Sequence, residues 1–428
     1  MMTLQPAAEL GRVSQASKLG LLTGTSILWL ALWAGINTGP WVLNEEHGSL
    51  LSWVHLLRAF LPHLALVVGG LWVSSVGWGS ALSGPVGLWL VYGLVSTLSC
   101  WMSPAPLNVL YWALAYLAPF PIVALVAGRP GSLGRLTELN HLTWLCATLC
   151  LVALVVLARE TLADGYGAFH RMEEVGGMAM SRSSGMARFA AVPAILAFVY
   201  LMKGTGGQRM LAAPAFAGSA ALIYHMQSRG AILALAGSIA FMLFFIGPTA
   251  RRAALLLAVC ILVLAVADAL PGDALGRISE HLRRGQSDEQ LTSLTGRTGT
   301  WEQGWAVFLD SPLIGFGPQA DRAFLQAHAH NTLLYALLCS GILGATAFVA
   351  GFVVAWRALL RQLFLSFWER RSPDVLLLQV GGIIAFFSIR SIPEVCGALF
   401  GVDTLVLLPA IAYLWALDRR PFDSEEAT

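Results

Sequence analysis

The most regular pattern in this chain is a succession of apolar runs, each close to the length of helix that crosses a lipid bilayer. Short segments rich in Arg, Gly, Pro and other polar residues separate them. The runs are 19–38, 56–77, 85–102, 106–127, 139–158, 189–203, 209–227, 230–248, 253–270, 330–355, 375–393 and 400–417. This pattern predicts an all-α polytopic membrane protein with about twelve transmembrane helices, forming a single membrane domain over residues 1–428.

The composition supports this prediction and narrows it. Hydrophobic residues make up 57% of the chain and charged residues 12%, which is too apolar for an average soluble domain. The six cysteines fall mostly inside apolar runs with no Cys-x-x-Cys pair, which indicates buried hydrophobic residues and not a disulfide framework or a zinc site. No Gly-x4-Gly-Lys-Ser/Thr loop is present, so ATP is not expected to drive the chemistry.

The basic residues predict the orientation in the membrane. An even number of crossings places both termini on one side, and nearly every connection on that side carries Lys or Arg, which marks it as cytoplasmic. Most of the other arginines lie in two long segments on the outer side, 159–188 and 271–329. Because arginine is usually depleted from that side, its accumulation there suggests an anionic ligand.

Three polar clusters on the outer side could carry chemistry, and the first is Gln227-Ser228-Arg229-Gly230. Ser228 is suited to cap the helix that follows, and Arg229 would lie in its first turn. The free N–H groups and the dipole of the helix favour an anion there. The alternative is an arginine that snorkels to lipid headgroups.

The second cluster runs from Thr295 to Trp301 and continues to Gly317. A helix is predicted from Arg297, with Trp301 and Trp305 on one face, ending at the Ser-Pro and Gly-x-Gly turns that follow. It is expected to lie as an amphipathic helix on the membrane surface. The alternative is that the aromatic residues are membrane anchors and that Arg297 is only solvated.

The third cluster is His328-Ala329-His330-Asn331, directly before the apolar run that starts at Thr332. A histidine at the mouth of a spanning helix titrates near neutral pH and can take a proton from a hydroxyl group. Two alternatives remain open, which are a zinc pair formed by both histidines and a structural histidine that holds the loop. Arginines beside a neutral-range base suggest a bound phosphate or diphosphate next to a hydroxyl acceptor.

Taken in order along the chain, these motifs resemble the O-antigen ligase and polymerase superfamily. The matching positions are Ser228-Arg229-Gly230, Gly296-Arg297 with Trp301, Pro312 with Gly315 and Gly317, His330-Asn331 with Leu334, Gly341 with Gly344, and, less distinctively, Ser184 to Arg188. The resemblance implies a C-type glycosyltransferase fold in which a helical periplasmic loop, 271–329, covers a cavity open to the membrane, with 159–188 as a second periplasmic loop. It also implies an enzyme of the bacterial inner membrane with its active site on the periplasmic side.

The resemblance further implies the substrates and the site. The donor would be an O-antigen glycan on undecaprenyl diphosphate, the acceptor the lipid A-core oligosaccharide, and the product lipopolysaccharide. His330 would be the catalytic base, and Arg229 and Arg297 would bind the diphosphate, with Arg188, Trp301, Asn331 and Glu394 as further site residues. Membrane lipids would be a further partner. No cofactor, metal or nucleic acid is implied.

Two alternative functions remain at this stage. An O-antigen polymerase would use the same donor and the same base with a second lipid-linked glycan as acceptor. A transporter or flippase for lipid-linked glycans would also need outer arginines, but it would need ionisable residues within its spans, where only Asp268 and Asp403 lie near helix ends.

Overall fold

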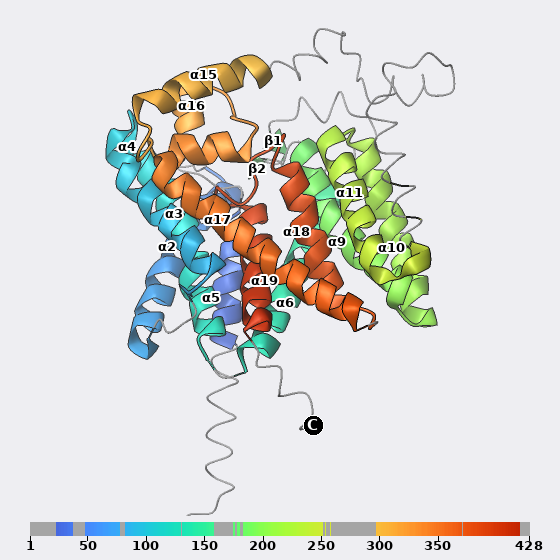
Figure 1. Ribbon diagram of the computed structural model, residues 1–428. Coiled ribbons are helices and arrows are strands. Elements are labelled where there is room, and N and C mark those ends of the chain that lie inside the picture. The colour runs from blue at the N-terminus through green and yellow to red at the C-terminus, as the bar shows by residue number, and fades with distance from the viewer. Residues whose placement is uncertain are drawn as a thin grey trace, which may run out of the picture.

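In the computed structural model, most of the chain forms a bundle of helices (Figure 1). The described residues are 23–36, 48–77, 82–129, 131–157, 174–175, 178–179, 183–250, 253, 257, 297–369 and 371–419. Their helices are Thr23–Ala34, α2 (Leu50–Val76), α3 (Pro85–Leu98), η3 (Ser99–Met102), α4 (Pro106–Leu117), α5 (Pro119–Ala127), α6 (Ser132–Leu157), α9 (Ser183–Lys203), α10 (Gly206–His225), α11 (Arg229–Ile246), α15 (Arg297–Asp310), α16 (Ala320–Leu325), α17 (Thr332–Trp368), α18 (Val375–Arg390) and α19 (Val402–Asp418). Two short antiparallel strands, β1 (Glu174–Val175) and β2 (Met178–Ala179), form a hairpin.

Among the described residues, seven helical stretches are long and apolar enough to cross a membrane. They are Ser52–Val76, Pro85–Met102, Pro106–Ala127, Ser132–Leu157, Ser184–Lys203, Arg229–Ile246 and Thr332–Trp368. Thr23–Ala34 and α18 are shorter apolar helices, and the predicted run at 253–270 lies largely outside the described residues. The helical membrane architecture is therefore as predicted, while the number of about twelve crossings stays a prediction.

Helix α17 extends beyond the apolar run that predicted it. The run ends at 355, but the helix continues to Trp368. Arg357 and Arg361 end the apolar run but not the helix, because Leu359 and Leu363 continue the buried face of the helix beyond the run. Arg361 also forms an ion pair with Asp418 at 2.9 Å. The segment between the predicted runs 330–355 and 375–393 is thus in its first part a helical extension of α17.

The centre of the bundle is formed by α18 and α19. Every residue of α19 from Val402 to Leu414 is buried, and α19 packs against α6 and α17. Helix α18 packs against α9 and α11. Close packing is also evident between α3 and α17, where Trp89 stacks on Phe348 and its indole N–H donates to the Phe348 carbonyl at 3.1 Å. These contacts hold in place the ends of α17, α18 and α19, which carry the polar residues discussed below.

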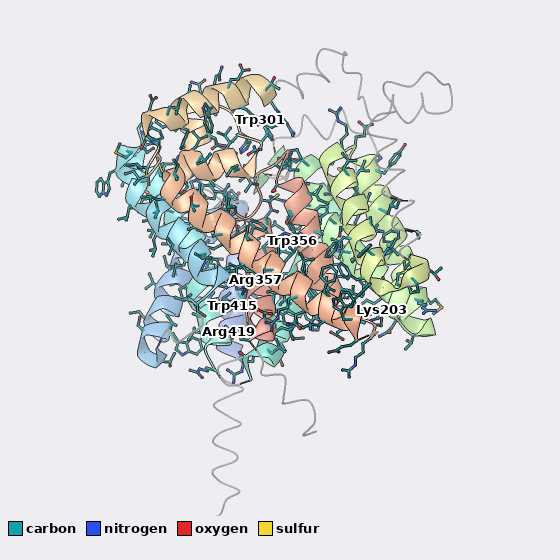
Figure 2. All side chains as sticks on the ribbon, viewed as in Figure 1. Lys203, Trp301, Trp356, Arg357, Trp415 and Arg419 are labelled. Carbon is teal, nitrogen blue, oxygen red and sulfur yellow. The ribbon has the colours of Figure 1, made fainter. Side chains whose placement is uncertain are left out.

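The two ends of the bundle differ in character. Helices α15 and α16 lie across one end, which we call the capped end (Figure 1). Figure 2 shows Trp301 at the capped end and Lys203, Trp415 and Arg419 toward the opposite end, which we call the basic end. There Arg419 lies over the Trp415 ring, 5.0 Å from its centroid. Basic and aromatic side chains together are typical of a membrane–water interface.

A break in α17 anchors the segment that connects α15 to the bundle. Gly341 has φ 58°, and the loop after α15 inserts its backbone at this point. The N–H groups of Phe316 and Gly317 donate to the carbonyls of Leu338 and Cys339, each at 2.8 Å, and Ile342 N–H donates to the Pro312 carbonyl at 2.8 Å. A Cβ on Gly341 would lie 2.2 Å from the Leu313 carbonyl carbon, so a side chain does not fit.

This junction explains two of the sequence motifs. The Pro-x-x-Gly-x-Gly and Gly-x-x-Gly segments meet each other, and a Cβ on Gly315 would lie 2.6 Å from the Leu338 carbonyl oxygen. The glycines allow two backbones to approach closely enough to exchange hydrogen bonds. The loop that leads to His330 is thereby fixed to the N-terminal part of α17.

Candidate functional site

At the capped end the structure brings His330, Glu394 and Arg297 together. His330 immediately precedes α17, Arg297 is the first residue of α15, and Glu394 lies in the connection between α18 and α19. His330 Nδ1 is 3.2 Å from Glu394 Oε2, and Arg297 Nη2 is 3.3 Å from Glu394 Oε1. A histidine, a carboxylate and an arginine from three distant parts of the sequence thus form one connected group.

The contact with Glu394 defines which ring nitrogen of a neutral His330 carries the proton. A carboxylate only accepts hydrogen bonds, so Nδ1 carries the proton in this contact and Nε2 carries the lone pair. The His330 side chain is 31% exposed, so the ring is accessible and not sealed in the core. This is the arrangement of a general base whose ring is oriented by an acidic partner.

Glu394 is held as a carboxylate by its surroundings. Burial alone would raise its pKa, but the hydrogen bond from His330 and the positive charges of Arg390, His330 and Arg297 outweigh burial and lower the pKa to about 2. Glu394 is therefore ionised throughout the neutral range. It remains a hydrogen-bond acceptor for His330 Nδ1 throughout that range.

Arg297 contacts the segment that carries Glu394 through two of its nitrogens. Its Nη1 donates to the Pro393 carbonyl at 2.7 Å while Nη2 contacts Glu394. The predicted helix from Arg297 is present as α15, which spans Arg297–Asp310 in the described part of the chain. A guanidinium has five N–H donors, so it can contact this segment and still bind another anion.

Helix α11 begins beside the same segment. A Cβ on Gly230 would lie 3.1 Å from Cγ of Pro393, so the first turn of α11, with Arg229 as its first residue, packs against the Pro393–Glu394 stretch. Ser228 occupies the N-cap position as predicted, but its side chain makes no capping hydrogen bond. Its backbone has ψ 85°, whereas the effective cap Asn331 is extended with ψ 126°.

A second set of charged residues lies behind this group, and the sequence did not predict that they lie together. Arg188 on α9 is 3.5 Å from Asp403 on α19, and Arg390 at the end of α18 donates to the Ser184 carbonyl at 2.8 Å. Arg390 is only 3% exposed, and within the described part of the chain its Nε and Nη1 have no hydrogen-bond partner. A buried guanidinium of this kind contributes strong positive potential next to Glu394. The signal that could have identified it is an arginine at the outer end of an apolar run.

Two other predicted site residues hold the backbone around His330. The Asn331 side chain caps α17 by accepting from Leu334 N–H at 2.9 Å, and its Nδ2 donates to the Ile392 carbonyl at 3.1 Å. The indole N–H of Trp301 donates to the Ala329 carbonyl at 2.8 Å. Trp301 and Trp305 were expected on one face of α15, but Trp301 packs inward whereas Trp305 is 50% exposed.

His328 and His330 have separate partners. His328 Nδ1 is 3.6 Å from Asp321 Oδ2, whereas His330 Nδ1 contacts Glu394. The two ring centroids are 5.6 Å apart. Among the described residues, no group of three or more His, Cys, Asp or Glu side chains is placed to hold a metal ion. The geometry thus favours separate roles for the two histidines over a shared metal.

Comparison with known families gives a match over part of this site. A family model described as O-antigen ligase matches residues 214–349, which include Arg229, Arg297 and His330 but not Arg188 or Glu394. No curated protein matches the chain. The match covers less than half of the chain, and it supports the assignment to the O-antigen ligase family that the sequence motifs indicated.

Proposed function

We propose that this protein is an O-antigen ligase, a glycosyltransferase that moves a polysaccharide from undecaprenyl diphosphate to the lipid A-core oligosaccharide. The observation that carries the proposal is the His330–Glu394–Arg297 group, because it joins a base with an accessible lone pair to an arginine suited to diphosphate. Two of its three members lie within the segment matched by the O-antigen ligase family model.

In the proposed reaction His330 activates the acceptor. Its Nε2 removes the proton of a sugar hydroxyl on the lipid A-core as the oxygen attacks the anomeric carbon of the donor glycan. The resulting imidazolium is stabilised by the ionised carboxylate of Glu394, which lies 3.2 Å from Nδ1. The proton then passes to solvent and restores the base.

The arginines stabilise the leaving group. As the new bond to the acceptor oxygen forms, the bond between the anomeric carbon and the diphosphate oxygen breaks, and undecaprenyl diphosphate leaves with increased negative charge. Arg297, Arg229 and the N-terminus of α11 offset that charge. Because arginines supply the positive charge, the reaction needs no metal ion, and a single displacement inverts the anomeric centre.

The proposed membrane orientation follows from the two ends of the bundle. The basic end, with Lys203 and Arg419, faces the cytoplasm, and the capped end faces the periplasm of a bacterial inner membrane (Figure 2). Both termini would then be cytoplasmic, with loops 159–188 and 271–329 periplasmic. A lipid-linked donor could approach the capped end from within the membrane, while the lipid A-core approaches from the outer leaflet.

The test distinguishes the ligase from the polymerase, which shares the donor and the base. In a cell with a complete pathway, His330→Ala in a ligase should leave full-length glycan on undecaprenyl diphosphate and lipopolysaccharide that ends at bare core. The control is His141→Ala, an exposed histidine of α6, which should leave lipopolysaccharide normal. Core capped with one repeat unit in the His330→Ala strain would reject the ligase in favour of the polymerase.

A transporter gives a different result in the same assay. Purified protein supplied with lipid-linked glycan and lipid A-core in detergent should form the transfer product if it is a ligase. A transporter would form none, since no membrane separates two compartments. Product formation that is lost in His330→Ala would therefore support an enzyme and exclude a carrier.

A further inference from the structure

We propose that Asp321, acting together with Trp301, is a positioning residue that fixes the backbone of the base His330. The inference rests on the proposed function, because it assumes that His330 acts on the acceptor. Neither residue is inferred to touch substrate. Both act through Ala329, the residue immediately before the base.

Asp321 is a buried carboxylate whose two oxygens accept hydrogen bonds from backbone N–H groups. It lies in the short helix α16 and is 0% exposed. Its Oδ1 accepts from Arg322 N–H at 2.9 Å, and its Oδ2 accepts from Ala329 N–H at 3.0 Å. Burial of a charge without such bonds is costly, so the carboxylate stabilises only the loop conformation that brings Ala329 to it.

Ala329 is held from both sides. Its N–H is bound by Asp321, and its carbonyl accepts from the Trp301 indole at 2.8 Å. Ala329 is itself 0% exposed. The peptide that leads into His330 is therefore fixed by one residue of α16 and one residue of α15.

The backbone in this loop needs such support. Gln319, Gln326 and His330 all have positive φ, at 66°, 51° and 46°. Residues other than glycine rarely adopt this conformation, and they keep it only where surrounding contacts determine it. The contacts of Ala329 are directly adjacent to His330 in sequence, so their loss should let the imidazole move.

The same carboxylate also faces His328. The Nε2 of His328 is 2.7 Å from Arg322 Nη2, and because a guanidinium only donates, Nε2 accepts there. Nδ1 then carries the proton and faces Asp321 at 3.6 Å. The lone pair of His328 is occupied, so this histidine forms part of the support and is not a second base.

The other side of the base is anchored independently. Thr332 N–H donates to the Ser391 carbonyl at 3.0 Å, and its hydroxyl donates to the Glu394 carbonyl at 2.8 Å. These bonds join α17 to the connection that carries Glu394. Asp321 and Trp301 therefore set the direction of His330 relative to a partner whose position is fixed without them.

The experiment uses variants that remove single hydrogen bonds. Trp301→Phe keeps an aromatic ring but removes the N–H donor, and its control is Trp305→Phe on the exposed side of the same helix. Asp321→Asn weakens the grip on Ala329, and its control is Asp310→Asn, an exposed acid at the end of α15. The purified full-length protein is assayed with undecaprenyl-diphosphate-linked glycan and lipid A-core.

We expect kcat to fall about three- to tenfold in Trp301→Phe, as for the loss of one hydrogen bond, and about tenfold or more in Asp321→Asn. The KM for the donor should not change, and both controls should turn over as wild type. A purely structural role would instead lower the thermal transition and the yield of folded protein. It would not lower kcat selectively while leaving the KM for the donor unchanged. If Asp321→Asn does not fold, Trp301→Phe carries the test.

Combination with His330→Ala separates the two possible failures. If Asp321 and Trp301 act through His330, Trp301→Phe should cause no further loss in the His330→Ala background. An additional loss there, or wild-type kcat in both single variants while His330→Ala is slow, overturns the positioning role and leaves the base assignment intact. Wild-type turnover by His330→Ala itself would overturn the proposed function instead.

Discussion

Two carboxylates at the capped end, Glu394 and Asp321, each lie against a histidine, but they leave those histidines in different chemical states. Glu394 has a side chain that is 20% exposed and contacts Nδ1 of a partly exposed His330. Asp321 is fully buried and faces Nδ1 of His328, whose Nε2 is occupied by Arg322. Two histidines separated by one residue thus each face an acidic residue with Nδ1, and the surroundings of Nε2 decide what each can do.

The largest expected effect tests this difference directly. His330→Ala should lower kcat for transfer by about a hundredfold or more, as is typical for the loss of a general base. His328→Ala should lower it much less, because this side chain supports the loop without taking the proton. Initial rates of transfer with purified protein measure both. Equal losses in the two variants would mean that the assignment of separate roles is wrong.

An intermediate effect is expected when Glu394 loses its charge. Glu394→Gln keeps a side chain of similar size but removes the stabilisation of a protonated His330, so kcat should fall by about tenfold to a hundredfold. Asp310→Asn, which removes an exposed carboxylate, serves as the control. A Glu394→Gln enzyme with the wild-type rate would contradict an electrostatic role for this carboxylate.

The lowered pKa of Glu394 gives this variant a pH signature. A carboxylate whose pKa is lower in the folded state stabilises the protein above its ordinary pKa, and that stability is lost as the pH falls toward about 2. The difference in thermal transition between wild type and Glu394→Gln should therefore shrink as the pH falls from the ordinary pKa of a glutamate toward about 2. A difference that does not shrink in acid would show that another group controls it.

A further effect, of a size comparable to that of Glu394→Gln, concerns the arginines. Arg229→Ala and Arg297→Ala should each lower transfer by at least about tenfold, since losing a charged partner of a diphosphate costs about 1.5–3 kcal/mol. Lysine should restore activity only in part, because it lacks the planar fork. The Arg297 variant should also disturb Glu394, to which Arg297 is paired at 3.3 Å, so we expect its kcat to fall more than that of Arg229→Ala.

A chelator completes that experiment. The wild-type protein should keep its activity in the presence of the chelator. Loss of that activity would instead favour a metal ion bound by His328 and His330. If either alanine variant turned over at the wild-type rate in the chelator, the arginine clamp would be wrong.

Part of the site was accessible from sequence because some residue types are informative on their own. Arginines on the outer side of a membrane protein and a histidine before a spanning helix both stand out from an apolar background, which is why Arg229, Arg297 and His330 could be named. Glu394 entered only through the family resemblance. Asp321 could not be singled out, because the burial that makes it informative is not visible in a linear pattern.

The sequence by itself determined that the chain is built of membrane-type helices, because uncharged apolar runs of bilayer length have no other stable arrangement in lipid. It also determined which residue types are available for chemistry. Only the tertiary structure decided which of them meet, since His330 and Glu394 are 64 residues apart and their contact depends on how α17 packs with α18 and α19. The role of each histidine was decided there as well, because the proton on an imidazole is set by partners within hydrogen-bonding distance, and those partners come from other elements.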